Sequence, residues 1–64
     1  MKNMPNLQRF IGKKFDDVIV DLEMTIGQHY RVIRPGFYYT QEADPLRMNV
    51  KIDRAGVIVD FYRG

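Results

Sequence analysis

Cysteine is absent from this chain of 64 residues, so its fold must hold together without disulfide bonds. A chain of this length buries only about 60% of the surface that its unfolded form exposes. Its core must therefore be small, and it leaves no room for a large enclosed substrate pocket. We expect one domain that spans residues 1–64, with residues 1–6 flexible.

The composition argues against an enzyme. Serine and cysteine are both absent, and His29 is the single histidine. The chain therefore lacks a Ser/His/Asp set and a cysteine nucleophile, and it lacks the ligand set of a zinc site. It also has no glycine-rich phosphate-binding loop. We expect no catalytic residue, no metal and no cofactor.

The charge and the hydropathy pattern exclude two further classes of partner. The net charge is only +2 and the basic residues are scattered along the chain, which argues against nucleic-acid binding. No apolar run approaches the ~18 residues of a membrane span, so no membrane partner is expected. The first nine residues are polar, unlike a secretory signal. Together with the lack of cysteine this predicts a cytoplasmic protein, and we expect a monomer, with a homodimer as the alternative.

One segment has the apolar periodicity of a helix, and its boundaries are marked. Apolar residues at helical spacing form one stripe over residues 15–26, and Gly27 is a suitable helix stop. Val20 and Met24 fall off this stripe, so they are expected on the exposed side. The apolar stripe consists of Phe15, Val18, Ile19, Leu22 and Ile26.

Three short segments have the pattern of strands. Residues 29–34 (HYRVIR), 47–53 and 57–62 are rich in β-branched and aromatic residues, and the last two are separated by a turn at residues 53–56. Alternation places Met48, Val50 and Ile52 on one face and Arg47, Asn49 and Lys51 on a polar face. Before the helix, Leu7, Phe10 and Ile11 are predicted to enter the core.

Residues 35–46 (PGFYYTQEADPL) form a long connection between two strands, and connections of this length are usually functional or disordered. The aromatic residues argue against disorder. We expect an extended, partly rigid loop, which is the conformation in which a protease binds its substrate. A loop held in that shape would bind a protease with little ordering cost.

Polar residues that follow the loop are candidates to hold it. Arg47 and Asn49 lie on the predicted polar face, and Thr40 and Glu42 point to the same side of an extended backbone. Contacts of Glu42 with Arg47, and of Thr40 with Asn49 or Arg47, would pin the loop and project Gln41 outward. The alternative from these residues alone is an ordinary surface loop.

With these features in place, the chain resembles the potato inhibitor I family of serine-protease inhibitors, and most closely its bacterial branch. The matching positions run from about Leu7 to Gly64 at fixed spacing. They are residues 10–13 (FIGK), 31–36 (RVIRPG) and 47–50 (RMNV), together with Thr40, Glu42, Asp53, Gly56, Ile58 and Gly64.

The resemblance implies an α+β fold, in which one helix packs on a small mixed sheet and a long exposed binding loop joins two parallel strands. It also implies a reversible, substrate-like inhibitor of serine proteases, with subtilisin-like enzymes as the expected targets. Its reactive bond would be Gln41–Glu42, and Arg47 and Asn49 would support the loop. The residues before this bond would be Tyr38 at P4, Tyr39 at P3 and Thr40 at P2. The expected reactive-loop residues are Tyr38, Tyr39, Thr40, Gln41, Glu42 and Ala43.

A second hypothesis keeps the scaffold but not the inhibition. The resemblance implies a bulky apolar residue at the position of Gln41, and glutamine is costly to desolvate in an apolar pocket. The alternative is a non-inhibitory interaction module that binds another protein through Tyr38 and Tyr39 or through Val20 and Met24.

Overall fold

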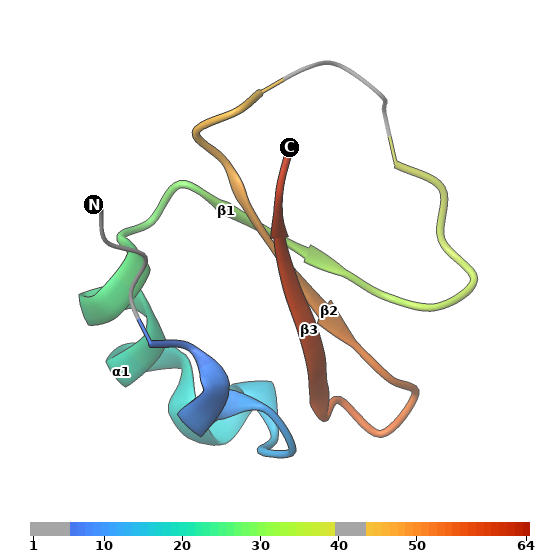
Figure 1. The fold of residues 1–64 in the computed structure, drawn as a ribbon. Coiled ribbons are helices and arrows are strands. Elements are labelled where there is room, and N and C mark those ends of the chain that lie inside the picture. Colours follow the sequence, from blue (N-terminus) through green and yellow to red (C-terminus); the bar gives the residue numbers. More distant parts are fainter. Residues whose placement is uncertain (1–5, 40–43) are drawn as a thin grey trace.

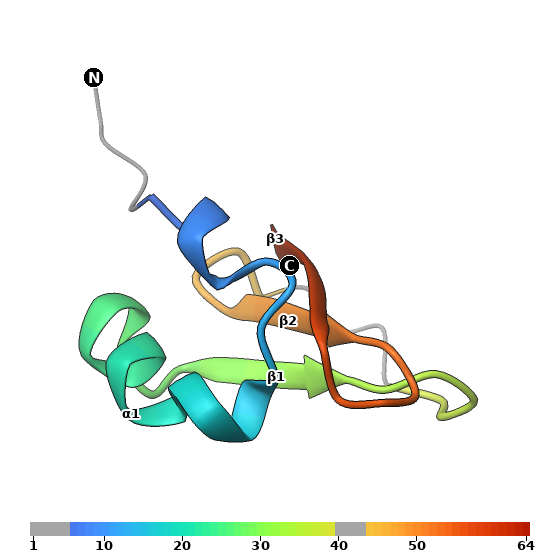
Figure 2. The same ribbon diagram turned by 90° about the horizontal axis from the view of Figure 1, so that it is seen from below.

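The computed structural model of the chain describes residues 6–39 and 44–64. Within these ranges, a short 3-10 helix, η1 (Gln8–Phe10), is followed by helix α1 (Phe15–Ile26). Strands β1 (Tyr30–Ile33), β2 (Met48–Ile52) and β3 (Ile58–Arg63) form one sheet in the order β1-β2-β3. The helix covers one face of this sheet (Figures 1 and 2). The predicted α+β architecture is thereby confirmed.

The sheet is mixed, because its central strand pairs in a different sense on each side. β2 runs parallel to β1, with Tyr30 opposite Met48, and antiparallel to β3. The β2–β3 hairpin closes as predicted through the turn at residues 53–56. There the Asp53 carboxylate accepts the N–H groups of Ala55 and Val57, both at 2.9 Å, and Gly56 adopts a φ of +84°.

Helix α1 has the bounds and the buried face that the sequence predicts. Phe15 and Leu22 are buried, and the other three residues of the apolar stripe pack against the core. The helix ends where Gly27 turns to a φ of +80° and donates its N–H to the Glu23 carbonyl at 2.8 Å. Val20 and Met24 are exposed, as expected.

The core lies between α1, η1 and the inner face of the sheet. Each buried leucine or phenylalanine of this kind contributes about 1.5–3 kcal/mol by leaving water. The buried apolar side chains are Leu7, Phe10, Phe15, Leu22, Met48, Val50, Ile52 and Ile58.

The prediction that Ile11 enters the core is wrong, since 37% of this residue is exposed. Phe10 takes the inward position instead and packs edge-on against Phe61. Just beyond, Gly12 donates its N–H to the Ile58 carbonyl at 2.8 Å, and Ile58 donates its own N–H to the Lys13 carbonyl at 2.9 Å. These bonds hold the segment along the start of β3, where Ile11 points away from the core.

One polar contact joins α1 to the sheet. The Tyr30 hydroxyl at the start of β1 donates to the Glu23 carboxylate at 2.5 Å, and its ring packs edge-on against Phe15. The hydrogen bond to Glu23 is the main cause that raises the pKa of Tyr30 to about 12, with partial burial and the negative charge of Glu23 adding to it. The phenol must therefore stay protonated for this link to persist.

We expect a spectrophotometric titration of the tyrosines to show one step near pH 12 that disappears in Tyr30→Phe. Because the folded-state pKa is raised, the stability that Tyr30 contributes is complete below pH 10 and is lost as the pH rises through about 12. The matched control Tyr38→Phe should leave that step in place, and circular dichroism recorded in parallel checks that the protein is still folded. A folded protein whose high-pH step survives in Tyr30→Phe would contradict the assignment.

Candidate functional site

The segment between β1 and β2 is the most unusual part of the fold. Because these two strands are parallel neighbours, the chain must cross from one end of the sheet to the other between Arg34 and Arg47 (Figure 1). The described residues of this crossing, 34–39 and 44–47, contain no helix. Gly36, with a φ of +82°, turns the chain at the start of this crossing. Four of the predicted loop residues, Thr40, Gln41, Glu42 and Ala43, lie outside the described residues, as do their predicted contacts with Arg47 and Asn49.

The aromatic side chains in the described first half of the loop differ in their exposure. Tyr38 is fully exposed and Phe37 is 66% exposed. Tyr39 instead turns back onto β1, where its hydroxyl accepts the Arg34 N–H at 2.8 Å and its ring lies 5.3 Å from the Arg31 guanidinium carbon. The expectation of an exposed Tyr38–Tyr39 pair is therefore wrong for Tyr39, which is half-buried.

Asn49 is the polar centre of the site. The sequence predicts it on an exposed polar face, but the side chain is completely buried. Its amide group donates to the Tyr62 carbonyl at 3.2 Å and to the Gly64 carbonyl at 2.9 Å, and its oxygen accepts the Arg31 Nε–H at 3.2 Å. Alternation along β2 cannot reveal this burial, because the cover comes from the strands on both sides.

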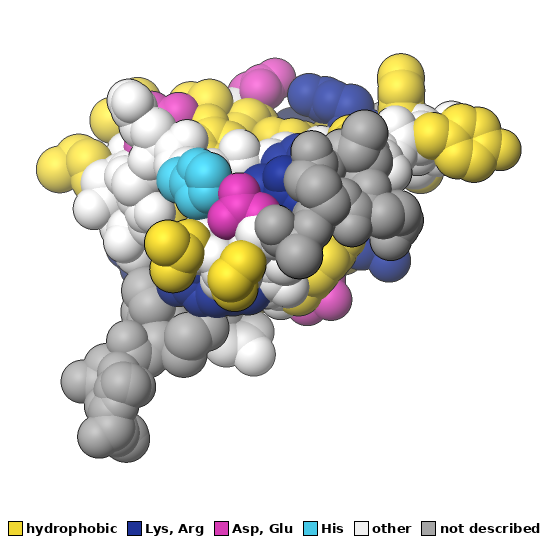
Figure 3. Space-filling view, turned by 90° about the horizontal axis from the view of Figure 1, so that it is seen from above, with side chains coloured by type: hydrophobic (Ala, Val, Ile, Leu, Met, Phe, Trp, Pro, Cys, Tyr) yellow, Lys and Arg dark blue, Asp and Glu magenta, His cyan; other side chains and the backbone are white. Residues whose placement is uncertain are grey.

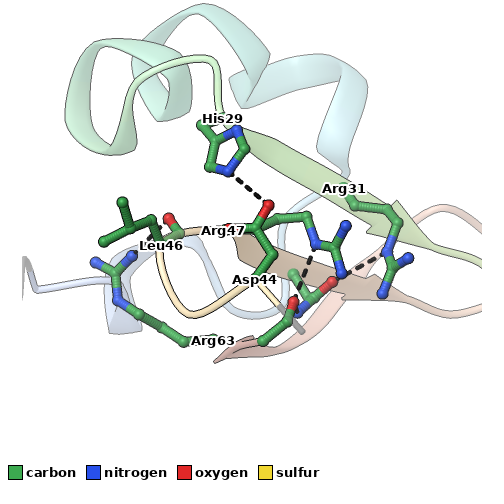
Figure 4. Close-up of polar contacts among 8 residues, drawn as sticks. His29, Arg31, Asp44, Leu46, Arg47 and Arg63 are labelled. Carbon is green, nitrogen blue, oxygen red and sulfur yellow. Dashed lines mark hydrogen bonds and ion pairs between the residues drawn. The ribbon is translucent and has the colours of Figure 1, made fainter. Parts of the chain in front are cut away.

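Arg47 lies beside Asn49 and binds the same acceptor. Its Nε–H donates to the Gly64 carbonyl at 3.0 Å, while the Gly64 N–H donates to the Arg47 carbonyl at 3.1 Å. Arg31, Arg47 and the Asn49 amide thus meet in one cluster at the end of the sheet where β3 finishes (Figure 4). We call Arg31, Arg47, Asn49 and Gly64 the support cluster.

Two members of the support cluster, Arg47 and Asn49, are predicted from the sequence, whereas Arg31 and Gly64 are not. Once the parallel register of β1 and β2 is known, Arg31 can be identified as a partner of Asn49, because the two residues lie directly opposite each other. Gly64 gives no such signal, since its main-chain atoms make the contacts.

A second side-chain contact lies at the end of the loop that leads into β2. The His29 Nε2 lies 2.9 Å from the Asp44 Oδ2, and Figure 3 shows the histidine against an acidic side chain on this face. The hydrogen bond from His29 is the main cause that holds the pKa of Asp44 below its usual range, with the charges of His29 and Arg47 and the Leu46 N–H acting in the same direction. The sequence pattern gives no sign that Asp44 is the partner of His29.

Two further findings concern the described residues as a whole. Among residues 6–39 and 44–64, no group of three or more His, Cys, Asp or Glu side chains is placed to hold a metal ion. Over the same residues, no helix has both the length and the apolar character that a bilayer crossing requires. The site offers instead a long loop with exposed aromatic side chains, held at both ends by polar contacts.

Comparison with known proteins gives two findings and one correction. Residues 3–64 match the Peptidase inhibitor I78 family. The solved structure of the elastase inhibitor AFUEI has a similar fold, with a TM-score of 0.74 and 23% sequence identity over 89% of this chain and 81% of that one. No curated protein sequence matches the chain. The resemblance to the potato inhibitor I family is therefore wrong at the level of the family, because the matching family is a distinct one.

The physical reason for that error lies in the matching residues themselves. Gly12, Gly36 and Gly56 all occupy positive-φ positions, so they mark where this fold must turn. The potato inhibitor I resemblance implied the same architecture as the one observed. Turn spacing could therefore indicate the fold without distinguishing between two families of inhibitors.

Removing the Asn49 side-chain amide should lower the free energy of unfolding by more than the loss of a few side-chain atoms would. In Asn49→Ala the two carbonyl groups and the Arg31 guanidinium lose their buried partner, which costs about 1–3 kcal/mol. We expect a lower midpoint of urea unfolding with an unchanged slope. Lys51→Ala is the matched control, because Lys51 is the next residue on the same face of β2 and is exposed. Equal effects of the two substitutions would contradict the role of Asn49.

Proposed function

Because the chain belongs to the peptidase inhibitor I78 family, we propose that it inhibits a serine protease by presenting the loop between β1 and β2 as a substrate-like segment. The chain is a protease inhibitor and not an enzyme. Family membership covers the inhibition of peptidases. We propose in addition which segment inhibits, which bond it presents and which class of protease it binds.

The observation that carries the proposal is the support cluster at the point where the loop enters β2. Asn49 is fully buried and binds Arg31 and Gly64, and Arg47 binds the same carbonyl of Gly64. These contacts tie β2, where the loop ends, to β1, where it begins, and to the end of β3. A loop whose ends are fixed in this way loses little conformational entropy when it binds a protease, so more of the contact energy becomes affinity.

We place the reactive bond at Gln41–Glu42, with Tyr38, Tyr39 and Thr40 before it and Ala43 after it. The fully exposed side chain of Tyr38 supports a direct contact with the protease. Tyr39 supports the loop from beneath, through the main-chain N–H of Arg34 and the guanidinium group of Arg31. Arg47 and Asn49 act from the other end, as residues that hold the loop and do not touch the enzyme.

Two protease classes are the first to test. The structural neighbour is named as an elastase inhibitor, which makes an elastase the first choice. The exposed aromatic side chains of Phe37 and Tyr38 suit an extended apolar binding groove, which makes a subtilisin-like enzyme the second.

The deciding experiment is a titration of an elastase and of a subtilisin with the purified protein, followed by mass spectrometry of the mixture. We expect stoichiometric loss of activity toward one of them, with Gln41–Glu42 intact or slowly cleaved. Tyr38→Ala should weaken inhibition about tenfold if the ring is desolvated by the enzyme. Rapid and complete cleavage of the loop without a stable complex would contradict the proposal.

The variant Arg47→Ala tests the support separately from the contact surface. Loss of a charge-assisted hydrogen bond costs about 1.5–3 kcal/mol, so we expect inhibition weaker by about tenfold or more and faster cleavage at Gln41–Glu42. Val20→Asp is the control, because Val20 lies exposed on α1. If Val20→Asp abolishes inhibition while Arg47→Ala does not, the inhibitory surface lies on the helix and the proposal for the loop is contradicted.

A further inference from the structure

The contact between His29 and Asp44 connects two segments that the support cluster does not join. His29 lies directly before β1, and Asp44 is the first described residue on the far side of the loop. Their side chains meet at 2.9 Å across fifteen positions of sequence (Figure 4). The contact therefore fixes the end of the loop that lies away from Tyr39.

Backbone hydrogen bonds make this connection specific. Asp44 begins a turn that closes where the Arg47 N–H donates to the Asp44 carbonyl at 3.0 Å. The next residue, Met48, donates its N–H to the carbonyl of His29 at 3.2 Å. The main chain of His29 thus holds the start of β2, and its side chain holds the start of the turn that leads into β2.

The charges around Asp44 favour the ionised carboxylate. His29 contacts it from the segment before β1, Arg47 attracts it from the segment before β2, and the Leu46 N–H adds a hydrogen bond. Arg63 reaches in from β3, where its guanidinium donates to the Leu46 carbonyl at 3.1 Å. Of these groups, histidine is the one whose charge normally changes between pH 5 and 8.

We propose that His29 is a positioning residue for inhibition, which fixes the exit of the inhibitory loop through Asp44 and holds it more firmly when the imidazole is protonated. The inference rests on the proposed function of the loop. A protonated imidazole makes a charge-assisted hydrogen bond with the carboxylate, whereas a neutral one offers only an ordinary hydrogen bond from one tautomer. Inhibition should therefore be tighter in mild acid than in mild base, and His29 should account for the difference.

The test compares inhibition constants against one protease at about pH 5.5 and about pH 8, where histidine changes its charge. Dividing the constant of each variant by that of the wild type removes the pH dependence of the protease itself. For His29→Gln we expect inhibition about two- to fivefold weaker at the lower pH and nearly unchanged at the higher pH, as suits an exposed ion pair. His29→Lys keeps a positive charge at both values and should restore most of the loss.

Asp44→Asn and Gln28→Ala complete the set. Adding His29→Gln to Asp44→Asn should cause no further loss, because the two residues act through one contact. Gln28→Ala should have no effect, since Gln28 is an exposed neighbour of His29. A variant-to-wild-type ratio for His29→Gln that is the same at both pH values would overturn the proposal.

A measurement on the free protein separates this inference from the proposed function. The Arg47 amide closes the turn that begins at Asp44, so its hydrogen exchange should speed up in His29→Gln at about pH 5.5, measured relative to wild type at that pH. If no protease is inhibited but this exchange changes, the proposed function fails and the positioning contact stands. If inhibition is found and this exchange does not change, the proposed function stands and the positioning role fails.

Discussion

The parallel pairing of β1 with β2 is the constraint on which the rest of this structure depends. Two parallel neighbours cannot be joined by a tight turn, so the chain must cross from one end of the sheet to the other. Most proteins make such a crossing with a helix, whose backbone groups bond to one another. Here the described residues of the crossing, 34–39 and 44–47, contain no helix, so side chains and neighbouring main-chain groups must hold them.

The two faces of the central strand β2 have different surroundings. Met48, Val50 and Ile52 point toward the helix and supply the apolar core. Asn49 points to the opposite face, where burial would be costly without partners and where it binds Arg31, Tyr62 and Gly64. One face of the strand therefore supplies the apolar core, while the other face joins β2 to β1 and to the end of β3 through Asn49.

Polar contacts also fix the described residues on the two sides of the loop. Tyr39 ties the outgoing half of the loop to β1 through Arg34 and Arg31. The contact of Asp44 with His29 ties the returning half to the start of the same strand. Tyr38 is left fully exposed between these anchors. Membership in a family of peptidase inhibitors shows the class of function of the chain, and the assignment of that function to this loop is our proposal.

The sequence by itself determined the elements that depend on local pattern. The helix runs over the predicted residues because its apolar stripe and the glycine stop are both short-range signals. The strands and the turn at residues 53–56 follow for the same reason. The sequence also indicated an inhibitor, although the family it suggested was wrong, because turn positions reflect a fold more than an ancestry.

Only the tertiary structure decided which polar residues are buried and what they bind. Asn49 reads as an exposed residue of an alternating strand, and it is buried because strands on both sides and the main chain of Gly64 close over it. Ile11 reads as a core residue, and it is exposed because hydrogen bonds to Ile58 fix the direction of its segment. His29 and Asp44 meet because the parallel register brings the start of β1 next to the start of β2. Each of these outcomes depends on contacts between distant parts of the chain, which local pattern does not contain.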